Sequence, residues 1–491
     1  MGLARSRSSH RTSRGHRKEA VARLLQGGNQ VAERWRIWPA PGEGRFIVFD
    51  TESLRFLEVE SRVAEILEGV MEGAPYAKLA AEARCSENDI SALLLRLQGD
   101  SAPTNEEPAG RVPAPLGKLS LNVSHICNMR CSYCYARGGD YGHGPSLMSA
   151  QTAVAALEVV RERFGGCRTI QFFGGEPLLN WPAILAVCEY IDANWRDLPV
   201  QPRLGVVTNL AYLPDQFDKI VNHFQLHVTV SLDGPAQVND QHRLLLDGGG
   251  SYRVVAENIR RLQSATSQPR AVEATFTMAH RAQGWTGDTL RAFFQDTFDI
   301  SVVLVAPAWD PNQPGLAHEL APFVRDRVTC LAPGITCRET VDPSGLFDML
   351  PLASKKNSPY WCGAGLATLT VTPAGDIYPC QLFLERPEFR IGNVRHGTWD
   401  SGVVERLRGN TKTADHVCRA CEVRWACRGC IAVALASRGT LNPRDENFCK
   451  LIRQGAEETL KGYRIILLSD GATRQRVRTI VERAFTSRTY A

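Results

Sequence analysis

Short apolar runs alternate with amphipathic helical stretches between residues 118 and 310. The apolar runs have the length and β-branched content of buried strands, and they cover residues 119–123, 169–173, 204–208, 226–232, 272–278 and 302–305. Helical spacing is found in residues 151–164, 182–194, 252–262 and 290–294. This alternation predicts an α/β fold with a parallel sheet. In barrels built this way, ligands bind where the strands end, so motifs at those ends are site candidates.

A different pattern precedes this unit, in residues 31–101. Residues 45–50 and 54–59 alternate between apolar and polar, which predicts a β-hairpin. Helical periods follow in residues 61–71, 75–83 and 86–97, and Ser86 with Asp89 forms a candidate capping box. A hairpin with three helices predicts a winged-helix-like unit. Its third helix opens with acidic residues and carries one basic residue, Arg96, which disfavours DNA recognition.

The other segments differ in composition. Residues 1–30 are expected to be a disordered basic tail, because the stretch from Arg5 to Lys18 holds Arg, His and Ser and no acidic residue. Residues 102–117 are rich in proline and predict a linker. The α/β core is expected over residues 118–335 and a cysteine-rich domain over residues 336–450. Residues 451–491 have helical apolar spacing and predict a helical cap.

Composition narrows the class of protein. The chain has 491 residues with 44% hydrophobic and 22% charged residues, as in globular proteins of several domains. It has no run of 18 apolar residues and no apolar signal core at the N-terminus, so we expect no membrane span and a cytoplasmic location. The net charge of +5 resides in the basic tail, so nucleic acid is not an expected partner.

Fifteen cysteines without a secretory signal indicate metal binding or catalysis more than disulfides. Cys127, Cys131 and Cys134, here called the loop cysteines, follow the strand 119–123 in a CxxxCxxC spacing. Four cysteines normally hold a [4Fe–4S] cluster, so three leave one iron open. An open metal position is typical of a catalytic site, whereas a structural metal knuckle is the alternative.

This loop, with Tyr133 before its third cysteine, resembles the cluster loop of radical S-adenosylmethionine (SAM) enzymes. The resemblance implies a partial TIM-type (β/α)6 barrel, in which SAM chelates the open iron and is cleaved reductively to a 5′-deoxyadenosyl radical. Motifs in the family's order stand at the predicted strand ends. The residues implied to contact SAM are Tyr133, Gly174, Gly175, Glu176, Pro177, Thr208, Asn209, Ser231, Asp233 and Arg243.

The resemblance gives these motifs different roles. In the Gly174–Pro177 motif, the glycines allow the backbone to approach a ligand, and Glu176 can accept from the SAM ammonium. Ser231 and Asp233 are implied to serve the ribose or the carboxylate, and Arg243 is a candidate carboxylate partner.

A second group of cysteines lies between residues 355 and 450. Zinc would use four of them and leave three, whereas seven cysteines suit two iron–sulfur clusters. The pattern resembles the SPASM extension of radical SAM peptide maturases. The resemblance assigns Cys418, Cys421, Cys427 and Cys449 (the four-cysteine set) to one auxiliary [4Fe–4S] cluster. It assigns Cys362, Cys380 and Cys430 (the three-cysteine set) to the other, with Cys337, a substrate thiolate or no ligand in the fourth place.

The chain departs from that pattern at two positions. Only two residues separate Cys427 from Cys430, where the usual number is three, which bears on how ligands pair with clusters. Gln381 follows Cys380, where sulfatase maturases carry an Asp thought to act as a base. An amide cannot take up a proton at neutral pH, so sulfatase maturation is disfavoured. The other cysteines, Cys85, Cys167, Cys188 and Cys330, are expected to be buried structural thiols.

Together these features predict a radical SAM enzyme that modifies a ribosomally made peptide by hydrogen abstraction and thioether crosslinking. Residues 140–142 and 147–149 also resemble thioether-forming maturases, and the N-terminal unit resembles their precursor-peptide recognition domain, where a leader peptide adds a strand. A flavodoxin- or ferredoxin-like protein is the expected electron donor. Carbon–carbon crosslinking, epimerisation and backbone excision remain alternatives, as does a non-enzymatic iron–sulfur regulator that binds DNA.

Overall fold

The computed structural model describes residues 35–39, 44–50, 56–98, 114–308, 316–324, 328–330, 339–341, 358–425 and 427–490. The basic tail at residues 1–30, residues 102–113 of the linker and Cys337 lie outside the described residues. In the described part of the chain, no helix is both long enough and apolar enough to span a membrane.

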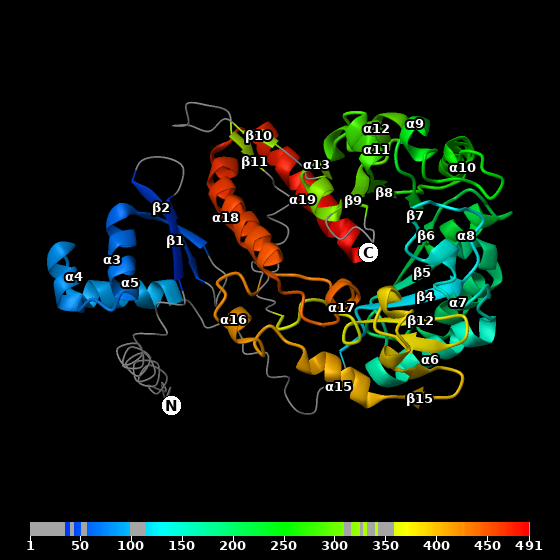
Figure 1. Ribbon diagram of the computed structural model, residues 1–491, viewed down its shortest axis with the longest axis horizontal. Coiled ribbons are helices and arrows are strands. Elements are labelled where there is room, and N and C mark those ends of the chain that lie inside the picture. Colours follow the sequence, from blue (N-terminus) through cyan, green and yellow to red (C-terminus); the bar gives the residue numbers. More distant parts are fainter. Residues whose placement is uncertain are drawn as a thin grey trace, which may run out of the picture.

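A ten-stranded sheet lies in the right-hand part of Figure 1, and its strand order is β15-β14-β13-β12-β4-β5-β6-β7-β8-β9. Its strands β4 to β9 are parallel neighbours in chain order, which confirms the predicted partial barrel. They span Lys118–Ser124, Thr169–Gly174, Arg203–Thr208, His227–Ser231, Ala271–Phe276 and Val302–Pro307. Apolar residues of these strands, such as Leu121, Phe172 and Val230, are fully buried, as expected for a parallel sheet covered by helices.

Helices connect these strands by the predicted alternation. They are α6 (Ala150–Phe164), α7 (Trp181–Asn194), α8 (Phe217–Phe224), α9 (Ala236–Asn239), α10 (Tyr252–Ala265), α11 (Met278–Ala282), α12 (Gly287–Phe298) and α13 (Leu316–Val324). One predicted strand, 272–278, is too long, because β8 ends at Phe276. Thr277 instead starts α11 in a capping box with His280, whose Nδ1 accepts from the Thr277 amide at 3.1 Å.

The C-terminal region continues the same sheet. Strand β12 (Thr368–Val371) pairs in parallel with β4, and Thr368 lies opposite Lys118. Strands β13 (Asp376–Tyr378), β14 (Gly392–Asn393) and β15 (Thr398–Trp399) follow as antiparallel neighbours. The remaining elements are β10 (Val328–Cys330), β11 (Glu339–Val341), α15 (Ser401–Gly409), α16 (His416–Arg419), α17 (Ile431–Arg438), α18 (Glu446–Leu468) and α19 (Gly471–Tyr490). The boundary expected after residue 450 therefore falls inside α18.

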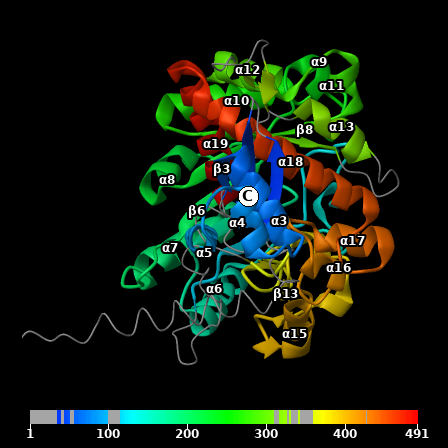
Figure 2. The ribbon, with the colours of Figure 1, turned by 90° about the vertical axis from the view of Figure 1, so that its left-hand side faces the viewer.

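The N-terminal unit has a core of its own and lies at one end of the molecule (Figures 1 and 2). The predicted hairpin and helices are present as β2 (Arg45–Asp50), β3 (Phe56–Glu60), α3 (Ser61–Met71), α4 (Tyr76–Glu82) and α5 (Glu87–Gln98). The capping box is confirmed, since Ser86 Oγ accepts from the Asp89 amide at 3.2 Å. The prediction missed β1 (Trp35–Pro39), which pairs with β2 and makes a three-stranded antiparallel sheet. Trp35 of β1 is buried against Leu67 and Ile90 in this core.

Candidate active site and cysteine clusters

The loop after β4 brings the loop cysteines together. Backbone hydrogen bonds join this loop to the segment after α9, because the amides of Arg130 and Ser132 donate to the carbonyls of Leu244 and His242 at 2.8 and 3.0 Å. Burial, with smaller contributions from Glu176 and the other two loop thiols, raises the pKa of the Cys127 thiol to about 12. A metal bound here would have to displace the thiol protons.

The donor set of the loop suits an iron–sulfur cluster. Three cysteines leave one iron of a [4Fe–4S] cube without a protein ligand. Such an open position is typical of a catalytic metal site.

The glycines at the end of β5 make close contact with the cluster loop. A Cβ atom on Gly174 would lie 2.2 Å from the Ser124 carbonyl oxygen, and one on Gly175 would lie 2.5 Å from that of Ile126. Gly174 has φ of +134°, which favours glycine. The Gly175 amide donates to the Ser124 carbonyl at 2.7 Å. The sequence predicted close approach to a ligand, and the contact in this structure is with the backbone that carries the loop cysteines.

Glu176 is fully buried, and its carboxylate is occupied by protein donors. Oε1 accepts from the Thr208 hydroxyl at 2.7 Å and from the Leu178 amide at 2.9 Å, and Oε2 accepts from the Asn209 amide at 2.7 Å. Burial nevertheless raises the pKa of this carboxyl to about 7. Oε2 accepts only one of these bonds, so the expected acceptor role of Glu176 toward a bound ammonium stays a prediction. Pro177 is buried at the start of the 3-10 turn that Glu176 caps.

Asn209 reaches the cluster loop from the end of β6. Its amide nitrogen donates to Asn128 Oδ1 at 2.8 Å and lies 3.7 Å from the Cys127 sulfur. A donor beside a thiolate stabilises the charge that the thiolate acquires when it binds metal. The structure thus places Thr208 and Asn209 next to the predicted cluster site.

Tyr133, Asp233 and Arg243 form one buried network beneath the loop. The Tyr133 hydroxyl donates to Asp233 Oδ2 at 2.5 Å and accepts from Arg243 Nη1 at 3.0 Å. Asp233 Oδ1 accepts from the Thr275 amide at 3.0 Å, so both oxygens of this fully buried carboxylate are used. In this structure Asp233 holds Tyr133, and its contact with SAM stays a prediction. Ser231, at the end of β7, is half-buried.

A cavity of about 760 Å³ lies between the cluster loop and the C-terminal region. Tyr133 and Cys134 line one side, and Gln381 and Ala432 line the other. Across it, Arg137 and Glu385 form an ion pair at 2.8 Å. Such a volume is typical of sites for small molecules or peptide side chains.

The cysteines of the second group gather in two places. In the three-cysteine set, burial raises the pKa of the Cys380 thiol to about 12, and Cys430 and Cys362 raise it further by proximity. In the four-cysteine set, all four side chains line one small cavity: Cys418, Cys421, Cys427 and Cys449. These are the two sets expected from the sequence, and the short spacing between Cys427 and Cys430 does not prevent the division.

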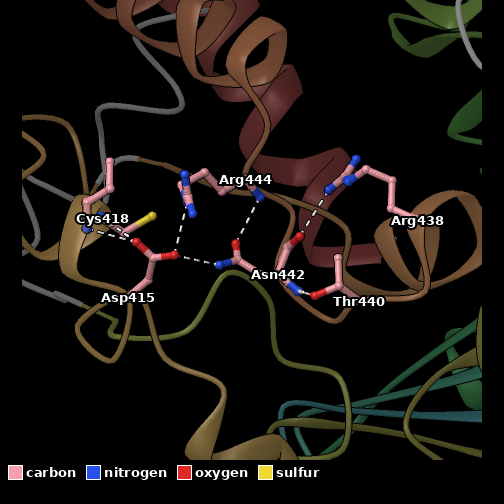
Figure 3. Close-up of polar contacts among 7 residues, drawn as sticks. Asp415, Cys418, Arg438, Thr440, Asn442 and Arg444 are labelled. Atoms are coloured by element: carbon pink, nitrogen blue, oxygen red, sulfur yellow. Dashed lines mark hydrogen bonds and ion pairs between the residues drawn. The ribbon is translucent and has the colours of Figure 1, made fainter.

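Asp415 ties together the two segments that carry the four-cysteine set (Figure 3). Oδ1 accepts from the amides of Val417 and Cys418 at 2.9 and 3.0 Å, which caps the N-terminus of α16. Oδ2 accepts from Asn442 Nδ2 at 2.8 Å and Arg444 Nε at 3.0 Å, in the loop that leads to Cys449. Sequence analysis missed Asp415, although an Asp three residues before a helical Cys is a recognisable cap signal.

Lys412 was also missed, and no sequence signal marks it. Its side chain is only 2% exposed and lines the cavity of the four-cysteine set. Of the cysteines expected to be structural, Cys167 and Cys188 are buried, and Cys85 is half-buried against the N-terminal core. Cys330 ends β10, and its side chain is not among those described.

Comparisons with known proteins agree with this geometry. Residues 121–280 match the radical SAM superfamily, and residues 362–422 match the SPASM iron–sulfur cluster-binding domain. A cysteine-type anaerobic sulfatase-maturating enzyme of Clostridium novyi is 24% identical over 341 residues, which cover 64% of this chain and 87% of the relative. The subtilosin biosynthesis protein AlbA of Bacillus subtilis is 20% identical over 297 residues, 59% of each chain.

The fold has a solved counterpart as well. The structure of a histidine-tagged anSMEcpe with bound AdoMet superposes with a TM-score of 0.54 and 16% identity, and the match covers 74% of this chain and 98% of that one. At this identity the likeness speaks for the fold alone. With the sequence matches, it leads to one assignment: the chain is a radical SAM enzyme that carries a SPASM iron–sulfur region.

Proposed function

We propose that this enzyme modifies a ribosomally made peptide by hydrogen abstraction and forms a thioether crosslink. The loop cysteines would hold the SAM-binding [4Fe–4S] cluster, and the two further cysteine sets would hold two auxiliary [4Fe–4S] clusters. When bound, the first cluster supplies the electron that cleaves SAM and so starts hydrogen abstraction. The remaining steps depend on how the chain positions SAM and peptide.

The cavity between the two cysteine-bearing regions carries this proposal. Cys134 of the cluster loop and Gln381, the neighbour of Cys380, line the same space. A substrate group held there is within reach of both regions at once. Crosslinking needs this arrangement, because the cluster-loop side must abstract one hydrogen atom from carbon. The other side must bind the substrate sulfur as a thiolate, after loss of its proton, and an auxiliary cluster there would accept the electron released when the C–S bond forms.

The residues around the loop have defined tasks in this scheme. Arg243 and Asp233 hold the Tyr133 ring against the loop, and Asn209 donates toward Cys127. We expect Glu176 Oε2, which accepts one hydrogen bond in this structure, to bind the SAM ammonium together with main-chain oxygen atoms of the Gly174–Pro177 motif. Ser231 is left with the ribose or the carboxylate of SAM as its expected partner.

The three-cysteine set favours thioether formation over sulfatase maturation, the activity for which the Clostridium novyi relative is named. Its three thiols leave one position of a cube without a ligand from the described residues, and a substrate Cys thiolate fits that place. Gln381 lines the cavity but cannot serve as a base, since its amide does not take up a proton at neutral pH. Carbon–carbon crosslinking, epimerisation and backbone excision use the same cavity and differ in the product mass.

The N-terminal unit supplies the proposed docking site for the peptide leader. Its sheet has the order β1-β2-β3, so β1 and β3 are edge strands to which an extended peptide can add. Arg36 of β1 lies 4.0 Å from Glu422 beside the four-cysteine set, which brings this unit next to the C-terminal region. Glu87 and Asp89 occupy the first turn of α5, a charge pattern opposed to DNA binding.

Anaerobic reconstitution of the full chain tests the proposal. We expect about twelve irons per chain, SAM-dependent release of 5′-deoxyadenosine, and a loss of two hydrogens from a Cys-containing peptide encoded beside the gene. Iodoacetamide should no longer alkylate the substrate Cys after reaction. Cys131→Ala should abolish deoxyadenosine formation, while Cys85→Ala, in the N-terminal core, should leave it unchanged.

Two results would contradict the proposal in different ways. About four irons per chain would remove both auxiliary clusters but leave a radical SAM enzyme. Intact iron content with salt-sensitive DNA binding and no SAM cleavage would instead favour an iron–sulfur regulator.

A further inference from the structure

A lysine is buried beside the four-cysteine set. The side chain of Lys412 is 2% exposed and lines the same cavity as Cys418, Cys421 and Cys427. Its amide donates to the Pro359 carbonyl at 2.8 Å, which fixes the backbone where the side chain enters the cavity. Burial lowers the pKa of the Lys412 ammonium to about 8. The three thiols act to raise this pKa, and Arg428 acts to lower it.

Two acidic residues in the segment that carries this set are paired with other cations. Asp415 binds Arg444 at 3.0 Å, and Glu422 lies 3.4 Å from Arg453. In the part of the chain that the structure describes, no carboxylate lies within ion-pair distance of Lys412. Burying an ammonium without an anion costs several kcal/mol, so the site is matched to a negative occupant. Four cysteine thiolates on a cluster supply such a charge.

We propose that Lys412 is the buried counter-charge of the cluster held by the four-cysteine set and that it raises the reduction potential of this cluster. The inference rests on the proposed auxiliary cluster at this set. Reduction adds one electron and one negative charge, and a fixed positive charge stabilises the reduced state more than the oxidised state. Lys412 therefore tunes the cluster without being one of its ligands.

Three arginines, Arg424, Arg444 and Arg453, line the same cavity. Arg424 is 8% exposed, and the two exposed arginines allow the effect of Lys412 to be ranked. Arg453 places Nη2 4.0 Å from the Cys421 sulfur, but its side chain is 44% exposed and it faces Glu422. Arg444 is bound to Asp415 and is 38% exposed. Solvent screens an exposed charge and a carboxylate offsets it, so either arginine should affect the potential less than Lys412.

A redox titration followed by electron paramagnetic resonance tests this ranking on the reconstituted full chain. The signal of this cluster is identified as the one lost in Cys418→Ala. Lys412→Met should lower the reduction equilibrium constant at least tenfold, which is 59 mV for a one-electron couple. Lys412→Arg keeps the charge and should stay near wild type, and Arg453→Met should shift the constant less than threefold.

The outcomes separate the inference from the cluster assignment beneath it. If Cys418→Ala removes no iron and no signal, the proposed auxiliary cluster is wrong and Lys412 has no cluster to tune. If the signal is present and Lys412→Met leaves its potential unchanged, the inference is overturned and the cluster stands. Failure of Lys412→Met to assemble this cluster supports the inference when Lys412→Arg assembles it, and overturns it when both variants fail.

Discussion

The hydroxyl of Tyr133 donates a 2.5 Å hydrogen bond to the carboxylate of Asp233, which links the cluster loop to the end of β7. The two residues are 100 positions apart in the chain. The same Tyr133 hydroxyl oxygen accepts a hydrogen bond from Arg243 Nη1 at 3.0 Å. A loop that must hold three thiols in fixed positions gains from such a buried anchor, because the network restricts the residue between Cys131 and Cys134.

We predict that Asp233→Asn weakens cluster retention without unfolding the chain. The substitution removes a charged acceptor from a buried network, a loss of about 1–3 kcal/mol. Iron should pass to a chelator several-fold faster than in wild type, and deoxyadenosine formation should fall about tenfold. Asp192→Asn, which changes an exposed carboxylate on α7 paired with Arg196, is the matched control. Equal iron-release rates in the two variants would contradict an anchoring role.

Gly175→Ala should displace the cluster loop. Its Cβ would lie 2.5 Å from the Ile126 oxygen and 2.7 Å from the Ile126 carbonyl carbon, and backbone atoms cannot rotate away. We expect loss of most iron from the first cluster, with deoxyadenosine formation reduced to background. Gly409→Ala, at the end of α15, has no atom within 4 Å of the new Cβ and should leave both readouts unchanged. Full activity in Gly175→Ala would show that the backbone at Ile126 can shift to accommodate the added Cβ without loss of the cluster.

Glu176 should make stability depend on pH in a defined window. Burial raises the pKa of this carboxyl from 4.5 to about 7, so the folded chain keeps a proton that the unfolded chain releases. Stability therefore falls as the pH rises through this window. The unfolding free energy of wild type minus that of Glu176→Gln should decrease by up to about 1.4 kcal/mol per pH unit between pH 4.5 and about 7. Above about pH 7 this difference should become constant. Denaturant unfolding of both iron-free proteins between pH 4 and 8 measures this, and a difference that grows with pH would refute it.

Asp415→Ala should release one auxiliary cluster and spare the first cluster. Asp415 accepts four hydrogen bonds from the two segments that carry the four-cysteine set. Its removal breaks the hydrogen bonds that hold these two segments together. Iron should fall from about twelve to about eight per chain while deoxyadenosine formation without peptide persists. Asp400→Ala removes the aspartate that caps α15, a helix without cysteines, at a similar cost of about 1 kcal/mol. Equal iron content in the two variants would show that Asp415 acts only as a helix cap and that its hydrogen bonds to Asn442 and Arg444 do not retain the cluster.

Local patterns predicted the barrel strands and the grouping of the cysteines. Strand periods and the CxxxCxxC spacing are short-range signals, and the chain places the residues they mark at neighbouring strand ends. β1 escaped prediction because it has five residues, ends at Pro39 and gains its burial only by packing Trp35 on helices more than 30 residues away. The parallel pairing of β12 with β4 was likewise invisible, since it joins segments about 250 residues apart.

The tasks of individual side chains were harder to predict than their neighbourhood. Glu176 and Asp233 were expected to contact SAM, and the structure adds that each buried carboxylate also accepts hydrogen bonds from protein donors. Lys412 stands in an ordinary Thr-Lys-Thr stretch, and only the folding of residues 418–449 around it creates its surroundings. A sequence pattern predicts which residues lie near one another. Which hydrogen bonds each side chain makes depends on how the folded chain packs around it.

The pairing of β12 with β4 has a consequence for shortened forms of this enzyme. Strand β4 carries the completely buried Leu119, Leu121 and Val123 and is an interior strand only because β12 lies beside it. In a chain truncated before residue 358, β4 would become an exposed edge strand directly before the loop cysteines. Its unpaired backbone groups could then pair with other copies of the chain. Expression of the barrel by itself should therefore give insoluble aggregates, whereas removal of residues 1–101 leaves that strand covered.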